Sequence, residues 1–236
     1  MPNEILRRIQ LPLFFVLAFG ITWATQIPAY IAAAERGKTL SNEANARHFL
    51  DLLRGDLDPG FAGIFLLFSF SFGLSLAGPF LIYLIIFTGL AEELGWRGYA
   101  LPELQRRYTA ERASWILGIG WGLWHLPSNI LMPLLAGQLT IPLAIASLLG
   151  LTLGIVGWTI VITWIYNNTQ SLFWIIVLHG LYNWVHSYVV LSSGSLAAQT
   201  AAGVLPWVIA LVVLKRYGAQ TLTRRERVNV GAPSEV

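Results

Sequence analysis

The chain of 236 residues contains no cysteine and few charged side chains, since Asp, Glu, Lys and Arg make up only 11% of it. The lack of cysteine excludes disulfides, thiolate zinc sites and a cysteine nucleophile. Soluble domains are about a quarter charged, so this chain has too little polar surface to cover a globule in water. With 56% hydrophobic residues and a mean hydropathy of +0.62, the composition predicts an integral membrane protein.

Long stretches without Asp, Glu, Lys or Arg separate the few charges, the longest between Arg112 and Lys215. Because about 20 apolar residues cross a hydrocarbon core, we expect an all-α, polytopic bundle of six to eight spans. The whole chain, residues 1–236, then forms a single membrane domain. The predicted helices are 11–34 (interrupted at Pro28), 60–96 (one kinked or two short), 113–134, 141–166, 171–191 and 202–217.

The polar segments predict which ends of the helices share a side of the membrane. A polar connection covers about 35–59, an interfacial connection covers 97–112, and a basic tail covers 215–236. Positive charge favours the cytoplasmic side, so the 97–112 connection and the C-terminus are expected there. The N-terminus shares that side if 60–96 crosses once and lies outside if it crosses twice. The basic tail is interpreted as an anchor rather than a nucleic-acid binding segment.

Two pairs of glycines have the four-residue spacing typical of helix packing in lipid: Gly118 with Gly122, and Gly150 with Gly154. Both pairs are therefore expected at close helix contacts. The sequence has no convincing internal repeat, so a transporter built from duplicated halves gains no support.

Ionisable residues at membrane depth are costly and mark functional sites. The candidates are Glu92, Glu93, Arg97, His125, His179 and His186. Three of the four histidines of the chain lie in apolar segments, which is the strongest physical signal in the sequence. Glu93 and Arg97 have the i, i+4 spacing and order that favour an ion pair.

Helical spacing places His179 and Asn183 on one face, and His186 extends that face toward the segment end. A glutamate and a histidine activate water, while a second histidine and an amide donate hydrogen bonds to an oxyanion. The same residue types also suit zinc, although no H-E-x-x-H motif is present. Taken alone, His125 is most simply a core histidine bonded to a backbone carbonyl, and His186 is most simply a bystander.

Three motifs follow one another on successive apolar segments: Glu92-Glu93-x-x-x-Arg97, Trp121-x-x-x-His125 and His179-x-x-x-Asn183. In this order they resemble the signatures of the CPBP family, the CAAX protease and bacteriocin-processing proteins. This family is also called Abi and is similar to the type II CAAX prenyl endopeptidases. The resemblance covers about residues 74–190.

The resemblance implies an intramembrane endopeptidase acting on a membrane-associated or lipidated substrate, in CAAX-type processing or in bacteriocin maturation and self-immunity. By analogy, Glu92 and His125 would activate the attacking water. His179 and Asn183 would stabilise the tetrahedral oxyanion. No cofactor is favoured, and a metal-dependent alternative would use Glu92, His125 and His179 as zinc ligands.

Glu93, Arg97 and Trp121 would support this catalytic set. Trp121 stands where most family members have phenylalanine, and its larger ring narrows the cavity beside the site. The stretch before Glu92 is shorter than in many members, which leaves the helix count open.

The partners implied are membrane lipids and a peptide or lipidated protein substrate, with no nucleic acid. The compact length favours a bacterial cytoplasmic membrane protein. Two other functions stay open. One is a non-enzymatic immunity or scaffold protein of the membrane, and the other is a proton- or metal-coupled transporter, because buried Glu and His also suit a relay.

Overall fold

The computed structural model describes residues 2–35, 77–191 and 195–224. These residues form helices and short turns without any strand, which confirms the all-α prediction for the part of the chain described. Most of the predicted polar connection 35–59, the first half of the predicted helix 60–96 and the end of the basic tail lie outside the described residues.

The first helix, α1 (Pro2–Glu35), is continuous and contains both Pro12 and Pro28. The predicted interruption at Pro28 is therefore wrong. A proline removes one backbone N–H bond, but membrane helices tolerate this loss because neighbouring groups satisfy the released carbonyl.

The second segment carries the first motif and alternates α-helical with π-helical turns, the latter labelled η. In order it contains α4 (Ala77–Leu84), η2 (Ile85–Leu90), α5 (Ala91–Gly95), η3 (Trp96–Ala100) and α6 (Leu101–Gln105). Most of the predicted connection 97–112 is helical, and its place at the membrane interface stays a prediction. The helix continues past residue 96 because Leu101 and Leu104 are buried in the core, and only residues 106–109 connect it to α7.

The remaining helices match the predicted spans closely, although α11 begins earlier than predicted. They are α7 (Ala110–Trp124), η4 (Pro127–Leu131), α8 (Met132–Leu135), α9 (Ile141–Thr169), α10 (Leu172–Trp184), η5 (Val185–Leu191) and α11 (Leu196–Tyr217).

Three helices among the described residues are long and apolar enough to cross a membrane: Ile9–Ala32, Ile141–Thr169 and Ala197–Tyr217. These helices support an integral membrane protein. The other segments are divided into shorter pieces by the π-helical turns. The count of six to eight spans stays a prediction.

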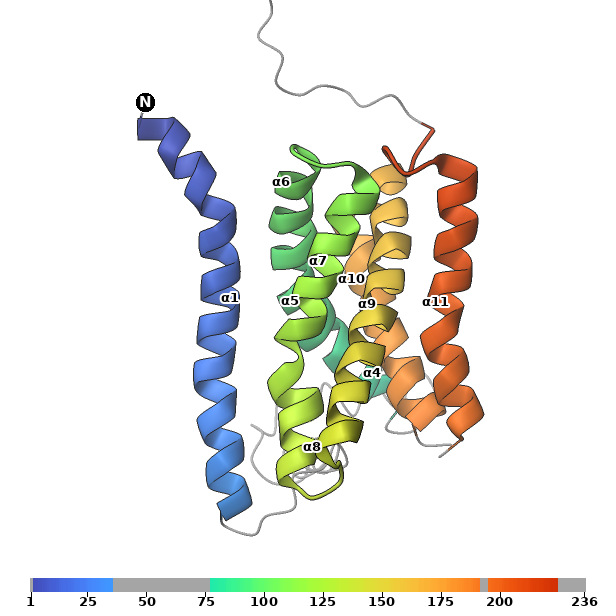
Figure 1. The fold of residues 1–236 in the computed structure, drawn as a ribbon. Helices are drawn as coiled ribbons and strands as arrows, with labels where there is room; N and C mark the ends of the chain where they lie inside the picture. Colours follow the sequence, from blue (N-terminus) through green and yellow to red (C-terminus); the bar gives the residue numbers. More distant parts are fainter. Residues whose placement is uncertain (1, 36–76, 192–194, 225–236) are drawn as a thin grey trace, which may run out of the picture.

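Figure 1 shows the start of α1, the α6–α7 connection and the end of α11 at the same end of the bundle. Backbone hydrogen bonds join the last two, because the Ala110 and Glu111 N–H groups donate to the Gln220 and Ala219 carbonyls at 3.0 Å each. The 106–109 turn and the chain after α11 thus share one side, as expected. How the predicted segment 60–96 crosses stays a prediction, because residues 60–76 lie outside the described residues. Which side of the membrane this end faces stays a prediction.

Close contact between α7 and α9 forms the centre of the bundle. A Cβ atom added to Gly118 or to Gly122 would lie 2.8 Å from the Cα of Val156 or Thr152 respectively, so the backbones touch there as predicted. Gly150 and Gly154 have open space around them, and the prediction for that pair is wrong. The reason is that α9 meets α7 through Thr152 and Val156, and Gly150 and Gly154 are two residues away from these, on the opposite side of the helix.

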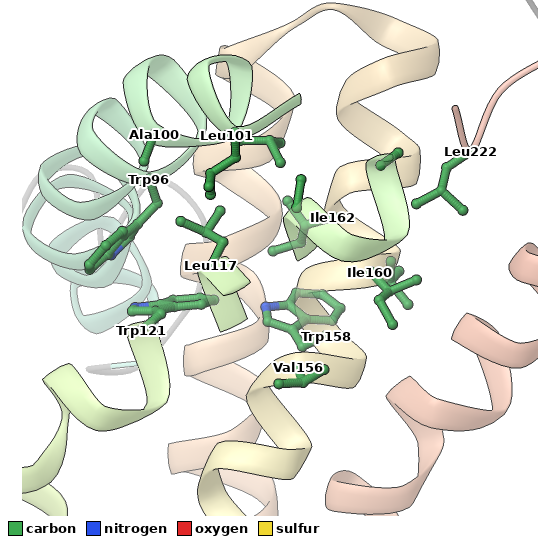
Figure 2. Packing of buried hydrophobic residues seen from close by; sticks show 14 of the residues in the cluster. Trp96, Ala100, Leu101, Leu117, Trp121, Val156, Trp158, Ile160, Ile162 and Leu222 are labelled. Atoms are coloured by element: carbon green, nitrogen blue, oxygen red, sulfur yellow. The ribbon is translucent and has the colours of Figure 1, made fainter. Parts of the chain in front are cut away.

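Tryptophan rings fill the core beside this contact. Figure 2 shows Trp121 of α7 below Leu117, with Trp96 on one side and Trp158 on the other. Trp96 and Trp121 are each 3% exposed, and their ring centroids are 6.4 Å apart. Buried aromatic rings contribute large apolar areas and fix geometry, so the motif residues on these helices are held by rigid neighbours.

Candidate active site

Glu93 is the centre of a buried charge network. Its Oε1 atom accepts hydrogen bonds from Arg97 Nη1 and from His179 Nδ1, both at 2.8 Å. Glu93 and Arg97 have no exposed surface, and His179 is 3% exposed. The predicted Glu93–Arg97 pair is confirmed, and the partnership of Glu93 with His179 on α10 is an addition that sequence spacing did not indicate.

Trp121 connects this network to Glu92. Its indole Nε1–H donates to Glu92 Oε2 at 2.8 Å, and the Arg97 guanidinium carbon lies 4.4 Å from its ring centroid in a cation–π contact. The ring also packs edge-on against His179, with centroids 5.3 Å apart. A phenylalanine could make the ring contacts but not the hydrogen bond. Tryptophan at this position therefore gives Glu92 a donor.

His125 follows the last turn of α7, where its Nδ1 lies 2.8 Å from the backbone carbonyl of Trp121. A carbonyl only accepts, so Nδ1 carries the hydrogen and Nε2 of the neutral ring presents a lone pair. The ring is held edge-on by Trp124, with centroids 4.9 Å apart. The backbone partner expected for a core histidine is present, and Nε2 still remains available for proton transfer.

His179 is oriented by Glu93, whose ionised carboxylate beside Arg97 can only accept a hydrogen bond. His179 Nδ1 therefore carries a hydrogen. In the neutral ring Nε2 is an acceptor, and in the imidazolium it is a second donor. An oxyanion-binding role thus requires the imidazolium form.

Asn183 lies one turn after His179 on α10, and its Nδ2 donates to Thr88 Oγ1 at 3.0 Å. Thr88 in turn donates to the Leu84 carbonyl at 2.6 Å. An amide nitrogen carries two hydrogens, so one of them remains for a further bond. Thr88 is not among the predicted site residues, although its position four residues before Glu92 places the two side chains near the same face of the helix.

Thr159 of α9 is a second missed partner. It is fully buried, and its Oγ1 lies 3.5 Å from Arg97 Nη2 at the limit of a hydrogen bond. No signal in the sequence distinguishes this threonine from Thr163, which bonds Ser114 elsewhere in the same interface. Only the packing of α9 against the first motif identifies it.

Two glycines bring the first and third motifs together. A Cβ on Gly180 would lie 2.6 Å from the Ile85 Cα, and one on Gly89 would overlap the Ile176 carbonyl oxygen. The backbones of η2 and α10 therefore touch. Gly180 is adjacent to His179, so this contact sets the distance between His179 and Glu93.

His186 stays outside the network. Its ring stacks on Tyr182 with centroids 6.1 Å apart, and its Nδ1 has no hydrogen-bond partner among the described residues. This position agrees with its interpretation as a bystander.

The metal-dependent alternative stays a prediction. Within the described ranges, no group of three or more His, Cys, Asp or Glu side chains is placed to hold a metal ion. His179 and His125 use their Nδ1 atoms for Glu93 and for a backbone carbonyl, respectively.

Exposure divides the site into two layers. Glu93, Arg97 and His179 are buried, whereas Glu92 and His125 are half-buried. Glu92 and His125, which each bond to Trp121, are therefore more accessible than the charged Glu93 network.

An all-helical membrane protein with ionisable residues gathered inside the bundle is the class that this fold and site define. Residues 74–185, just under half of the chain, match the family described as "Type II CAAX prenyl endopeptidase Rce1-like". A protein of Methanococcus maripaludis named "CAAX prenyl protease 2" is 34% identical over 161 residues, which are 65% of this chain. The match spans 57% of the length of that relative. No solved structure matches the chain.

Proposed function

We propose that the chain is an intramembrane endopeptidase that hydrolyses a peptide bond of a prenylated or otherwise membrane-associated protein. The observation that carries the proposal is the half-buried pair Glu92 and His125, joined through Trp121 to the buried Glu93 network. The match of residues 74–185 to the endopeptidase family and the name of the archaeal relative support the same reaction class.

Water activation is assigned to Glu92 and His125. Trp121 engages Oε2 of Glu92, so Oε1 takes one proton from the attacking water while His125 Nε2 accepts a hydrogen bond from the hydrogen that stays on the water oxygen. That oxygen bonds to the scissile carbonyl carbon, and the C=O electron pair moves to the carbonyl oxygen. The oxyanion then re-forms the C=O bond as the C–N bond breaks, and Glu92 delivers its proton to the departing amide nitrogen. General acid–base catalysis of this kind contributes about 10²–10⁴-fold.

The oxyanion is assigned to His179 and Asn183, as the family analogy implies. His179 would donate through Nε2–H in its imidazolium form, and Asn183 through the amide hydrogen that Thr88 does not use. A preorganised donor of this kind contributes about 3–4 kcal/mol to transition-state stabilisation. The Glu93 and Arg97 side chains support the site by fixing the imidazole ring.

The test is cleavage of an internally quenched peptide that ends in a prenylated C-a-a-X sequence, by purified protein in detergent. Glu92→Gln keeps an acceptor for Trp121 but removes the base, so the rate should fall at least about 100-fold. Glu103→Gln removes a partly exposed carboxylate of α6 and should leave the rate unchanged. Equal rates for wild type and Glu92→Gln would overturn the proposal.

The same assay separates the alternative functions. A non-enzymatic scaffold would bind the peptide without releasing product, and a transporter would show ion flux in liposomes without cleavage. Comparing the prenylated peptide with its unmodified counterpart then tests the substrate class. An endopeptidase specific for lipidated proteins should cleave the prenylated form faster.

A further inference from the structure

We propose that the α6–α7 end of the bundle carries a binding site for the phosphate group of an anionic phospholipid. A cavity of about 300 Å³ opens there, which is at the lower bound for ligand pockets. Its lining residues are Gln105, Arg106, Arg107, Tyr108, Thr109, Arg112 and Gln220. None of them belongs to the proposed active site, so the lipid site is independent of the endopeptidase activity.

The cavity lies at the depth of lipid headgroups. Gln105 and Asn167 exchange side-chain hydrogen bonds of 3.1 and 2.8 Å close to the end of the span Ile141–Thr169. Gln220 follows shortly after the end of the span Ala197–Tyr217. Because the hydrocarbon core ends where the apolar spans end, the lining residues face the headgroup region.

Arginine side chains give the cavity its charge. Arg106 pairs with Glu103 at 2.9 Å, but the Arg106 side chain is 60% exposed, and a surface ion pair of this kind is weak enough for Arg106 to bind another anion. Arg112 is exposed and forms no ion pair within the described ranges. Guanidinium groups bind phosphate oxygens in a bidentate manner, and the Tyr108 hydroxyl and the Gln220 amide add neutral hydrogen-bonding groups.

The backbone around the cavity is already bonded. The first two N–H groups of α7 donate to the chain after α11, and the Arg112 N–H donates to Thr109 Oγ1 at 3.2 Å. The helix N-terminus therefore supplies no amides for an anion, and side chains must provide the recognition. These bonds also fix the cavity walls against each other.

An apolar surface continues directly from the basic cavity, which favours a lipid over a soluble phosphate. Ile116 lies one helical turn after Arg112 and is 38% exposed, and Ile119 is 43% exposed. Acyl chains attached to a bound headgroup would cover this surface of α7. A soluble phosphate has no acyl chain to contact this apolar surface.

The experiment is a lipid titration of the full chain in a neutral detergent, with thermal unfolding followed by tryptophan fluorescence. Phosphatidylglycerol should raise the Tm in a saturable manner, and phosphatidylcholine should not. Arg106→Gln/Arg112→Gln should weaken the apparent affinity at least tenfold. Lys215→Gln/Arg216→Gln removes the same charge from the end of α11 outside the cavity and should change the affinity less than twofold.

Several results would overturn the lipid site. If both double variants lose affinity equally, diffuse surface charge binds the lipid. If inorganic phosphate at the same concentration gives the same saturable shift, the ligand is a soluble anion. Should the pocket variant fold poorly, Arg112→Gln alone is compared with Arg216→Gln by native mass spectrometry of bound lipid. Equal lipid retention by these two single variants would likewise refute the site.

Discussion

The contact between Gly180 and Ile85 gives a prediction about stability that does not depend on any activity. In Gly180→Ala the new Cβ would lie 2.6 Å from the Ile85 Cα and 2.8 Å from its backbone nitrogen. Ordinary carbon contacts need about 3.5–4.0 Å, so α10 must move away from η2 by about 1 Å. Overpacking of this kind costs about 1–3 kcal/mol.

The same movement strains the bond between Glu93 and His179. The Nδ1–Oε1 distance of 2.8 Å would lengthen toward the hydrogen-bond limit, and a bond to a charged group is worth about 1.5–3 kcal/mol. Replacing a helical glycine by alanine stabilises the helix by about 1 kcal/mol, which offsets part of this loss. The net destabilisation is therefore about 2–5 kcal/mol, which corresponds to a Tm decrease of roughly 5–15 °C for a chain of this size.

The assay is thermal unfolding of the purified variants in one detergent. Gly154→Ala is the matched control, because it lies inside α9 with open space around the position of the new Cβ. The control should keep or slightly raise the Tm. If Gly180→Ala unfolds at the same temperature as Gly154→Ala, the backbone contact between η2 and α10 does not hold the two motifs together.

Three further predictions concern the site. Trp121→Phe keeps the ring contacts but loses the 2.8 Å hydrogen bond to Glu92. A hydrogen bond to a charged group is worth about 1.5–3 kcal/mol, so kcat/KM should fall about tenfold or more. An unchanged kcat/KM would show that the indole N–H does not position Glu92. Glu93→Gln leaves Arg97 buried without its counter-charge, so the free energy of unfolding should drop by about 3–5 kcal/mol, measured against Glu103→Gln. Treatment with a chelator, followed by metal analysis, should leave the cleavage rate unchanged; a loss restored by zinc would instead favour a metal-bound hydroxide.

Composition and helical spacing predicted the membrane class, the helix positions and the Glu93–Arg97 pair, because these depend on properties local in sequence. Charge-free stretches fix where helices cross, and the i, i+4 rule pairs neighbours on one helix face. The expected close contact at Gly118 and Gly122 was confirmed for the same reason. The prediction from the identical spacing at Gly150 and Gly154 was wrong, since spacing does not reveal which side of a helix meets a neighbour.

The partners across helices could not be predicted. The bond from His179 to Glu93, rather than to Glu92, depends on how α10 faces the first motif, which the π-helical turns η2 and η3 flank. Such turns widen the helix and are frequent at functional sites, but they have no clear sequence signal. Trp121 was expected to narrow the cavity, and its hydrogen bond to Glu92 depends on how α7 faces α5.

The most direct test of the central claim is mass spectrometry of the products after a single turnover in water enriched in the heavy oxygen isotope. The wild-type protein should release a C-terminal fragment and place one heavy oxygen in the new carboxylate of the lipidated peptide. Glu111→Gln, which removes a carboxylate from the first turn of α7, should give the same products. Glu92→Gln should give neither product at the same time point. Cleavage by Glu92→Gln at the wild-type rate would contradict the assignment of Glu92 as the group that activates water.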